Sequence, residues 1–240
     1  MYVLEANNIT DEDRLCVAVI GDIIGSRALG VRRYDAQENL SQVMRQFNDQ
    51  YTQSILAKFI ITTGDEFQAL LTRATVIHDL IWQLENVFKY GELRLGIGLG
   101  TLSTQLNHFA VGMDGTTWHN ARSAIVEAKK EARLGGVFRG FSTENDLFLN
   151  GFARLLYYHR KDFTDRQREV VALLREGLTQ SEIAKRLSIS RQAANHHAQS
   201  SGWQVYREGE IAWETMLKEF DYSQRWSDER MAPVDIATSN

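Results

Sequence analysis

Residues 59–71 read Phe-Ile-Ile-Thr-Thr-Gly-Asp-Glu-Phe-Gln-Ala-Leu-Leu, which is an apolar run, a polar turn and a second mostly apolar run. Two runs that favour strand, joined by a short turn containing Gly, predict a β-hairpin. The tip is unusual because Asp65 and Glu66 stand between two strands of the kind that are buried. A carboxylate beside a core is costly unless it is paired. The alternative is that Gly-Asp is ordinary turn chemistry with both acids in water.

An acid also stands near the end of the first apolar run of the chain, residues 15–24. Asp22 is followed by Gly25 and Ser26, where we expect a turn toward a helix. Asp is depleted in strands, so strand propensity does not explain its place here. If this strand lies beside the hairpin, Asp22 and Asp65 converge on one cation. Two carboxylates with waters and substrate phosphates suit Mg²⁺.

Composition limits the classes of function. A chain of 240 residues is long enough for two domains. The net charge of −4 means that contact with nucleic acid must come from a local patch. Cys16 is the one cysteine, which excludes a disulfide within the chain and predicts a buried thiol. Residues 1–14 lack the features of a signal peptide, and no apolar run approaches the thickness of a bilayer. We therefore expect a cytoplasmic protein without a membrane partner.

Hydrophobic periodicity predicts an alternation of strands and helices in the first half. The predicted strands are 15–24, 55–62, 66–71, 93–100 and a short edge strand at 137–141, and the predicted helices are 33–51, 75–88 and 118–132. Because a hairpin interrupts the alternation, we expect an α+β fold with a mixed or antiparallel sheet. Alternate glycines at 96, 98 and 100 leave one face of a strand bare, for a ligand or for a packed helix.

The second half carries signals for helix starts. Thr164 is a candidate N-cap, Thr179 forms a capping box with Glu182, and Ser190 precedes a further helix. This arrangement predicts a helix-turn-helix. The side chains expected to meet base edges or phosphates of double-stranded DNA are Ser190, Arg191, Gln192, Asn195, His196 and Gln199. The alternative is a three-helix module that contacts protein. The segment resembles the LuxR-type and sigma-factor region-four helix-turn-helix.

Four segments in the first half resemble the palm domain of class III nucleotidyl cyclases and GGDEF diguanylate cyclases: residues 21–26, 63–67, 93–100 and 121–129. The resemblance implies a ferredoxin-like palm with helices on a mostly antiparallel sheet. It implies that Asp22, Ile23 and Asp65 hold Mg²⁺ or Mn²⁺. Nucleotide contacts would come from Gly25, Ser26, Glu66, Arg122 and Lys129, and the catalytic set would be Asp22, Asp65 and Arg122. The alternative is that Arg122 and Lys129 are solvated and pair with Glu127 or Glu131.

The order of the two halves is similar to the SatD family of bacterial proteins over nearly the whole chain. We expect a palm domain at 1–144, a connecting helix at 145–162, a helix-turn-helix domain at 163–222 and a polar tail at 223–240. The leading hypothesis is a homodimeric, nucleotide-responsive DNA-binding regulator. The alternatives are an active magnesium-dependent nucleotidyl cyclase or cyclic-dinucleotide synthase, and a palm that serves only as a dimerisation scaffold.

Overall fold

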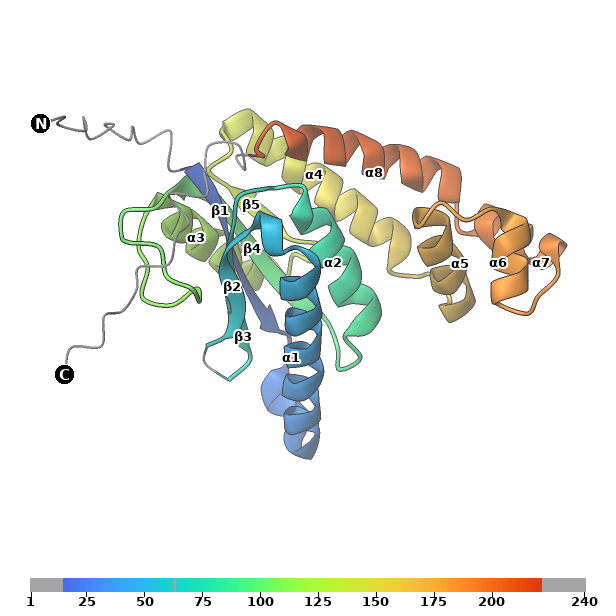
Figure 1. The fold of residues 1–240 in the computed structure, drawn as a ribbon, viewed down its shortest axis with the longest axis horizontal. Helices are drawn as coiled ribbons and strands as arrows, with labels where there is room; N and C mark the ends of the chain where they lie inside the picture. Colours follow the sequence, from blue (N-terminus) through green and yellow to red (C-terminus); the bar gives the residue numbers. More distant parts are fainter. Residues whose placement is uncertain (1–14, 63, 222–240) are drawn as a thin grey trace, which may run out of the picture.

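The protein is represented by a computed structural model, drawn in Figure 1, which describes residues 15–62 and 64–221. The predicted polar tail at 223–240 and residues 1–14 of the predicted first domain lie outside these residues. Of the helices described, none combines the length and apolar character that spanning a bilayer requires.

Five strands form one sheet in the order β2-β3-β1-β4-β5. They are β1 (Leu15–Ile23), β2 (Ile55–Ile61), β3 (Glu66–Leu71), β4 (Leu93–Thr101) and β5 (Val137–Arg139). The strands from β2 to β4 pair antiparallel, and β5 runs parallel to β4 at one edge. The α+β class, the mixed sheet and the hairpin are therefore confirmed.

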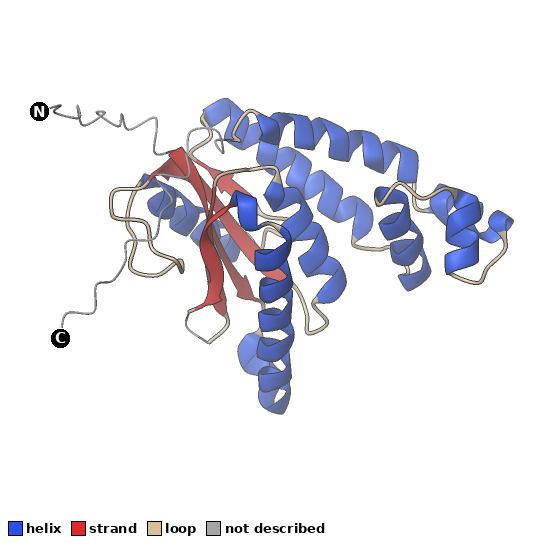
Figure 2. Ribbon diagram, in the orientation of Figure 1, coloured by secondary structure: helices blue, strands red, loops and turns tan. Residues whose placement is uncertain are grey.

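Helices cover both faces of this sheet (Figures 1 and 2). The helices α1 (Arg33–Gln50) and α2 (Val76–Val87) pack on one face, and α3 (Thr116–Lys130) packs on the other. The central strand β1 alternates between the two cores: Val17 and Val19 belong to the α1/α2 side, and Ala18 and Ile20 to the α3 side. Its continuous apolar run follows from burial on both faces.

The bare glycine face of β4 is covered by α3. A Cβ atom on Gly98 would lie 2.2 Å from the backbone nitrogen of Ala121, so only glycine allows this approach. The buried Thr117 fixes the start of α3, since its hydroxyl donates to the carbonyl of Gly98 (2.9 Å) and accepts from the amide of Ala18 (3.0 Å). We expected this face to be covered either by a ligand or by a packed helix, and the structure has the helix.

The end of α3 differs from the sequence prediction. The predicted range was 118–132, but the helix ends at Lys130. Ala132 takes a left-handed conformation (φ 50°), and the amide of Arg133 donates to the carbonyl of Ala128 (3.0 Å). This is the Schellman arrangement with alanine in the place that glycine usually holds.

Five α-helices follow β5 in the described chain: α4 (Thr143–Arg160), α5 (Asp165–Arg175), α6 (Gln180–Arg186), α7 (Arg191–Ser200) and α8 (Trp203–Lys218). In Figure 1, α4 and α8 lie side by side next to the sheet, and α5, α6 and α7 form the far end of the molecule. Leu149 of α4 and Trp213 of α8 are buried in the same core as α2. The helices α5 to α7 have a small core of their own around Val170, Ile183 and Ala194.

The predicted helix starts of the second half are confirmed. Thr164 and Thr179 each form a full capping box, with Gln167 and Glu182 respectively. The hydroxyl of Ser190 accepts from the amide of Ala193 (3.0 Å). Each cap satisfies amide groups that the first turn of a helix leaves without partners, which is why these sequence positions are informative.

Candidate functional site

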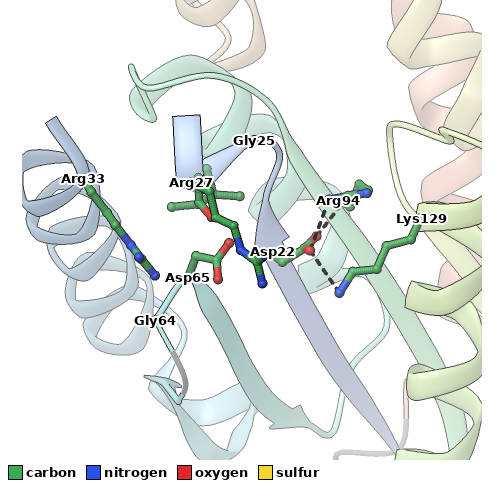
Figure 3. Close-up of a pocket in the computed structure, with 10 residues that line it drawn as sticks. Asp22, Gly25, Arg27, Arg33, Gly64, Asp65, Arg94 and Lys129 are labelled. Carbon is green, nitrogen blue, oxygen red and sulfur yellow. Dashed lines mark hydrogen bonds and ion pairs between the residues drawn. The ribbon is translucent and has the colours of Figure 1, made fainter. Parts of the chain in front are cut away.

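A cavity of about 520 Å³ opens where β1 ends. It is bounded by the end of β1 and the turn after it, the start of α1, the β2–β3 turn, β4 and α3. Its lining residues are Asp22, Ile23, Gly25, Ser26, Arg27, Arg33, Gly64, Asp65, Arg94 and Lys129. Figure 3 shows Asp22 and Asp65 approaching this space from two different segments. Asp22 and Asp65 therefore line the same cavity.

Asp22 lies on the α3 side of β1 and is only 6% exposed. Arg94 is its cross-strand neighbour on β4, and its Nε and Nη2 atoms donate to the two carboxylate oxygens at 3.1 and 3.3 Å. The Nζ atom of Lys129 lies 3.0 Å from Oδ2. Two cations therefore stabilise a carboxylate that burial alone would make costly.

Asp65 is positioned by a turn that α1 supports. Gly64 has φ +66°, a left-handed conformation that glycine adopts without strain. The side-chain amide of Gln37 donates to the carbonyl of Gly64. A Cβ atom on Gly64 would lie 2.8 Å from Nη2 of Arg33, so this arginine passes close over the turn. The start of α1 thus places Asp65 and Arg33 on the same side of the cavity.

Gly25 and Ser26 form the floor between Asp22 and α1. Gly25 has φ +68° and precedes the 3₁₀ helix η2 (Ser26–Arg32), whose first turn includes a bond from the amide of Ala28 to the carbonyl of Gly25 (2.8 Å). Ser26 is buried. This 3₁₀ helix replaces the simple turn expected from the sequence, and it brings Arg27 to the cavity.

The cavity carries an excess of positive charge. Four of its lining residues are cationic, namely Arg27, Arg33, Arg94 and Lys129, and two are acidic, which leaves a formal charge of +2. Sequence reasoning identified Lys129 but not the three arginines. A concave site with this balance favours an anion, and arginine suits the geometry of phosphate oxygens.

Arg122 and Glu66 lie apart from this cavity. They form a two-pronged ion pair with each other, with N–O distances of 2.8 and 3.0 Å. The pKa of Arg122 is raised, chiefly by its hydrogen bonds to Glu66. Arg122 lines a second cavity of about 230 Å³ together with Trp118 and Gln68. The structure therefore divides the predicted nucleotide-binding residues between two places, and neither Arg122 nor Lys129 pairs with Glu127 or Glu131 in the part described.

Oxygen atoms that line the larger cavity suit a magnesium or manganese ion, which would have to share Asp22 with two cationic side chains. Asp22, Asp65 and the main chain at Ile23 offer hard oxygen atoms, which such ions prefer. Residues 15–62 and 64–221 contain no group of three or more His, Cys, Asp or Glu side chains placed to hold a metal. Because Arg94 and Lys129 already contact Asp22, an ion there must share or displace these two cations.

The predicted DNA-contacting residues lie together on α7 and its N-cap. Ser190, Arg191, Gln192, His196 and Gln199 are exposed. Asn195 is half-buried, and its side-chain oxygen accepts from Nε2 of Gln180 on α6 (2.8 Å). Arg191, Gln192, His196 and Gln199 can thus reach a partner, whereas the hydroxyl of Ser190 caps α7 and Asn195 joins α7 to α6.

A buried polar cluster that the sequence did not reveal joins α2 to α5 and α8. The imidazole of His78 lies 3.0 Å from Glu210 and 3.1 Å from Glu214. The Nε atom of Arg175 lies 3.0 Å from Glu210, and its guanidinium stacks over the ring of Trp82 (4.3 Å). Glu210 is fully buried. The cluster connects the sheet region to the helix that leads into α6 and α7.

Comparison with known proteins gives one family match. The model of the SatD family matches residues 16–217. No protein with a curated description matches. Among solved structures, the crystal structure of a regulator of polyketide synthase expression from Bifidobacterium adolescentis matches with 15% identity and a TM-score of 0.26, over 88% of this chain and 85% of that one. At this identity and TM-score the likeness supports no statement about fold or function.

Proposed function

The chain belongs to the SatD family, and we propose that it is a nucleotide-responsive DNA-binding regulator. In this proposal the five-stranded sheet with α1, α2 and α3 is a palm domain that binds a nucleotide with Mg²⁺. The helices α5 to α7 form a helix-turn-helix that contacts double-stranded DNA. The observation that carries the proposal is the open cavity in which Asp22 and Asp65 meet four cationic side chains.

The charge and shape of the cavity support a phosphate-bearing ligand. Arg27, Arg33, Arg94 and Lys129 approach one space from four different segments, so they can surround an anion. Its volume of about 520 Å³ lies within the range of roughly 300–1,000 Å³ that holds small-molecule ligands. The two carboxylates add negative charge to the same site, which a divalent cation bound beside the phosphate would offset. Mg²⁺ or Mn²⁺, held by Asp22, Asp65 and the main chain at Ile23, would supply that charge.

The exposed face of α7 supports DNA as the second partner. Arg191, Gln192 and His196 carry hydrogen-bond donors and acceptors suited to base edges in the major groove. Ser190 caps the N-terminus of α7, the end at which recognition helices contact DNA. Because the whole chain has a net charge of −4, attraction to DNA would have to come from this local surface.

The cluster around His78 supports communication between the two sites. It joins α2, which packs on the sheet, to α5 and α8, which flank α6 and α7. A shift of α2 would therefore displace α5 through the contacts of Arg175. We propose homodimers as the DNA-binding form, since helix-turn-helix proteins commonly read two half-sites with two subunits.

A thermal-shift screen tests the nucleotide part. We expect a nucleoside triphosphate with Mg²⁺, at about 100 times its Kd, to raise Tm by roughly 5–10 °C. Arg33→Met, which removes one lining cation, should reduce this shift. Arg45→Ala removes an exposed arginine of the same helix and serves as the matched control, with the full shift retained. Absence of any shift with all four triphosphates would contradict nucleotide binding and favour a scaffold role.

An active nucleotidyl cyclase or cyclic-dinucleotide synthase is a second candidate, because both carboxylates reach the same open cavity. This function predicts magnesium-dependent turnover of a nucleoside triphosphate that Asp65→Asn abolishes. Bound but unconverted nucleotide, measured by chromatography of the reaction mixture, would favour the regulator.

A further inference from the structure

An apolar strip runs along the outer side of α4. Leu147 and Leu155 are each 70% exposed, and Phe148 and Tyr158 are exposed by 46% and 50%. Gly151, also exposed, lies in the middle. At about 100° per residue, these five residues fall within an arc of roughly 100°. The opposite side of the helix, with Leu149, Ala153 and Leu156, is buried in the main core. We call the five exposed residues the α4 stripe.

Large apolar side chains gathered on one exposed helix face are typical of an interaction surface. We propose that the α4 stripe is the surface through which two copies of this chain pair, with their α4 helices crossing antiparallel near Gly151. This deepens the homodimer part of the proposed function and is independent of its nucleotide part.

The ends of α4 favour an antiparallel second copy as the partner. Glu144 is exposed in the first turn, and Lys161, whose ammonium lies 3.8 Å from the carboxylate of Asp162, is exposed just past the last turn. An antiparallel pair brings Glu144 of each helix toward the end of the other helix that carries Lys161. It also places opposite ends of the two helix dipoles together. A parallel pair would instead bring like charges together, which is unfavourable.

The spacing of the stripe is self-complementary about Gly151. Leu147 and Leu155 are four residues before and after it, so each Leu147 meets Leu155 of the second copy, and the contact occurs twice. This is the requirement for a two-fold symmetric interface. A Cβ atom on Gly151 would meet nothing within 4 Å in the single chain. The glycine therefore leaves room that a second helix can fill.

Light scattering after gel filtration of the full chain tests the interface. We expect a dimer for the wild type and a monomer for Leu155→Glu. Val205→Glu on α8 changes a residue that is also 70% exposed and should remain dimeric. Gly151→Gln should weaken the dimer by about tenfold or more, while its Tm stays equal or rises because glycine disfavours helix. That combination separates loss of pairing from loss of folding.

Cysteine cross-linking tests the antiparallel register. The native Cys16 is buried, so introduced thiols can be followed on the surface. Under mild oxidation Gly151→Cys should form a covalent dimer with itself. Tyr158→Cys should not, but it should cross-link to Glu144→Cys when the two variants are mixed. Self-linking of Tyr158→Cys would overturn the antiparallel arrangement.

The possible outcomes separate this inference from the wider proposal. A wild-type dimer that survives Leu155→Glu and Gly151→Gln would overturn the α4 stripe as the interface and leave the homodimer in place. A monomeric wild type would overturn both, and another segment of the chain or a different protein would then be sought on the stripe. Neither result bears on nucleotide binding, which the thermal-shift screen measures separately.

Discussion

Asp22 is buried, charged and held by two cations, and this combination determines how the cavity can bind a ligand. Its two oxygens already accept from Arg94 and contact Lys129. Lys129 is 40% exposed in its side chain, so it can turn toward a ligand at little cost, whereas Arg94 is more enclosed. We therefore expect an incoming phosphate to take Lys129 first, and Asp22 to become available to a metal ion only then.

Lys129→Met tests this order of events at the residue level. We expect nucleoside triphosphate binding to weaken by about tenfold or more, since a hydrogen bond to a charged group contributes roughly 1.5–3 kcal/mol. Mg²⁺ binding without nucleotide should strengthen, because one competing cation is removed. Calorimetric titration measures both. Lys130→Met is the matched control on the next residue of α3. Unchanged affinity for both ligands in Lys129→Met would show that this lysine has no part in the site.

Gly98→Ala tests the close approach of α3 to β4. The added methyl group would lie 2.2 Å from backbone of α3, which cannot move without disturbing the helix. We expect a loss of about 1–3 kcal/mol or more in the free energy of unfolding, the usual cost of overpacking. Urea unfolding measures it. Gly25→Ala is a useful comparison because the space around Gly25 is open and only its backbone conformation is strained. Equal effects of the two changes would contradict the packing argument.

At the level of elements, the cluster between α2, α5 and α8 predicts how stability depends on pH. Burial tends to lower the pKa of His78, but hydrogen bonds to Glu210 and Glu214 outweigh it, and the pKa is raised above 6.5. The pKa of Glu210 is lowered to about 2, since the hydrogen bond from His78 and the charge of Arg175 overcome burial. The pKa of Glu214 is also lowered to about 2, chiefly by its hydrogen bond from His78. Asp79 and Arg207 complete the surrounding charges.

The signs of these shifts define a pH window. A raised histidine pKa stabilises the fold below pH 6.5, and that contribution is lost as pH rises through the pKa of the folded state. The lowered glutamate pKa values stabilise the fold above about pH 4.5, and this is lost as pH falls toward about 2. We therefore expect the cluster to stabilise the protein most between about pH 4.5 and 6.5.

His78→Gln tests the window by urea unfolding at pH 6 and at pH values above the shifted pKa of the histidine. At pH 6 the variant should lose on the order of 3 kcal/mol, since it removes one partner of a buried charged group. At higher pH the difference from wild type should shrink, because the wild type has then lost the same charge. A difference that is equal at both pH values would contradict a charged His78 in the folded protein.

At the scale of the whole molecule, α7 lies at the far end from the sheet (Figure 1), whereas the cavity is lined by residues of the sheet region. Separate variants should therefore remove one function and keep the other. Arg191→Ala should weaken DNA binding by about 1–3 kcal/mol if the residue meets a base. If it meets a phosphate, binding should weaken about equally for all sequences and its salt dependence should fall by about one unit of slope. Fluorescence anisotropy across a salt series measures both, and nucleotide affinity should stay unchanged. Retained DNA affinity and slope would exclude α7 as the contact.

Much of the sheet region could be predicted from the sequence because its signals are local. The two apolar runs within residues 59–71 and the Gly-Asp turn between them specify a hairpin, and Asp22 and Asp65 follow from acids placed at strand ends. Arg27 and Arg33 could not be predicted as cavity residues, since they depend on the path of η2. Arg94 could not be predicted as a partner of Asp22 without knowing that β4 lies next to β1. Arg122 was expected near Lys129, but seven residues of helix separate them by about 10 Å along the axis.

In the second half, too, features with local signals could be predicted from the sequence and long-range contacts could not. Thr164, Thr179 and Ser190 mark helix starts within three residues of their partners, so the sequence reveals them. His78 and Glu210 are separated by 132 residues, and no local pattern indicates that they meet. Long-range polar contacts of this kind depend on how helices pack, which the sequence of each helix alone does not express.

The most direct test of the proposed regulator is its DNA affinity with and without a nucleoside triphosphate and Mg²⁺, compared between the wild type and Asp65→Asn. The account predicts that the ligand changes the affinity of the wild type for its DNA. Asp65→Asn, which alters the cavity alone, should keep the ligand-free DNA affinity and lose that change. An identical response to nucleotide in the two proteins, or no response in the wild type at a nucleotide concentration that saturates its thermal shift, would contradict the account.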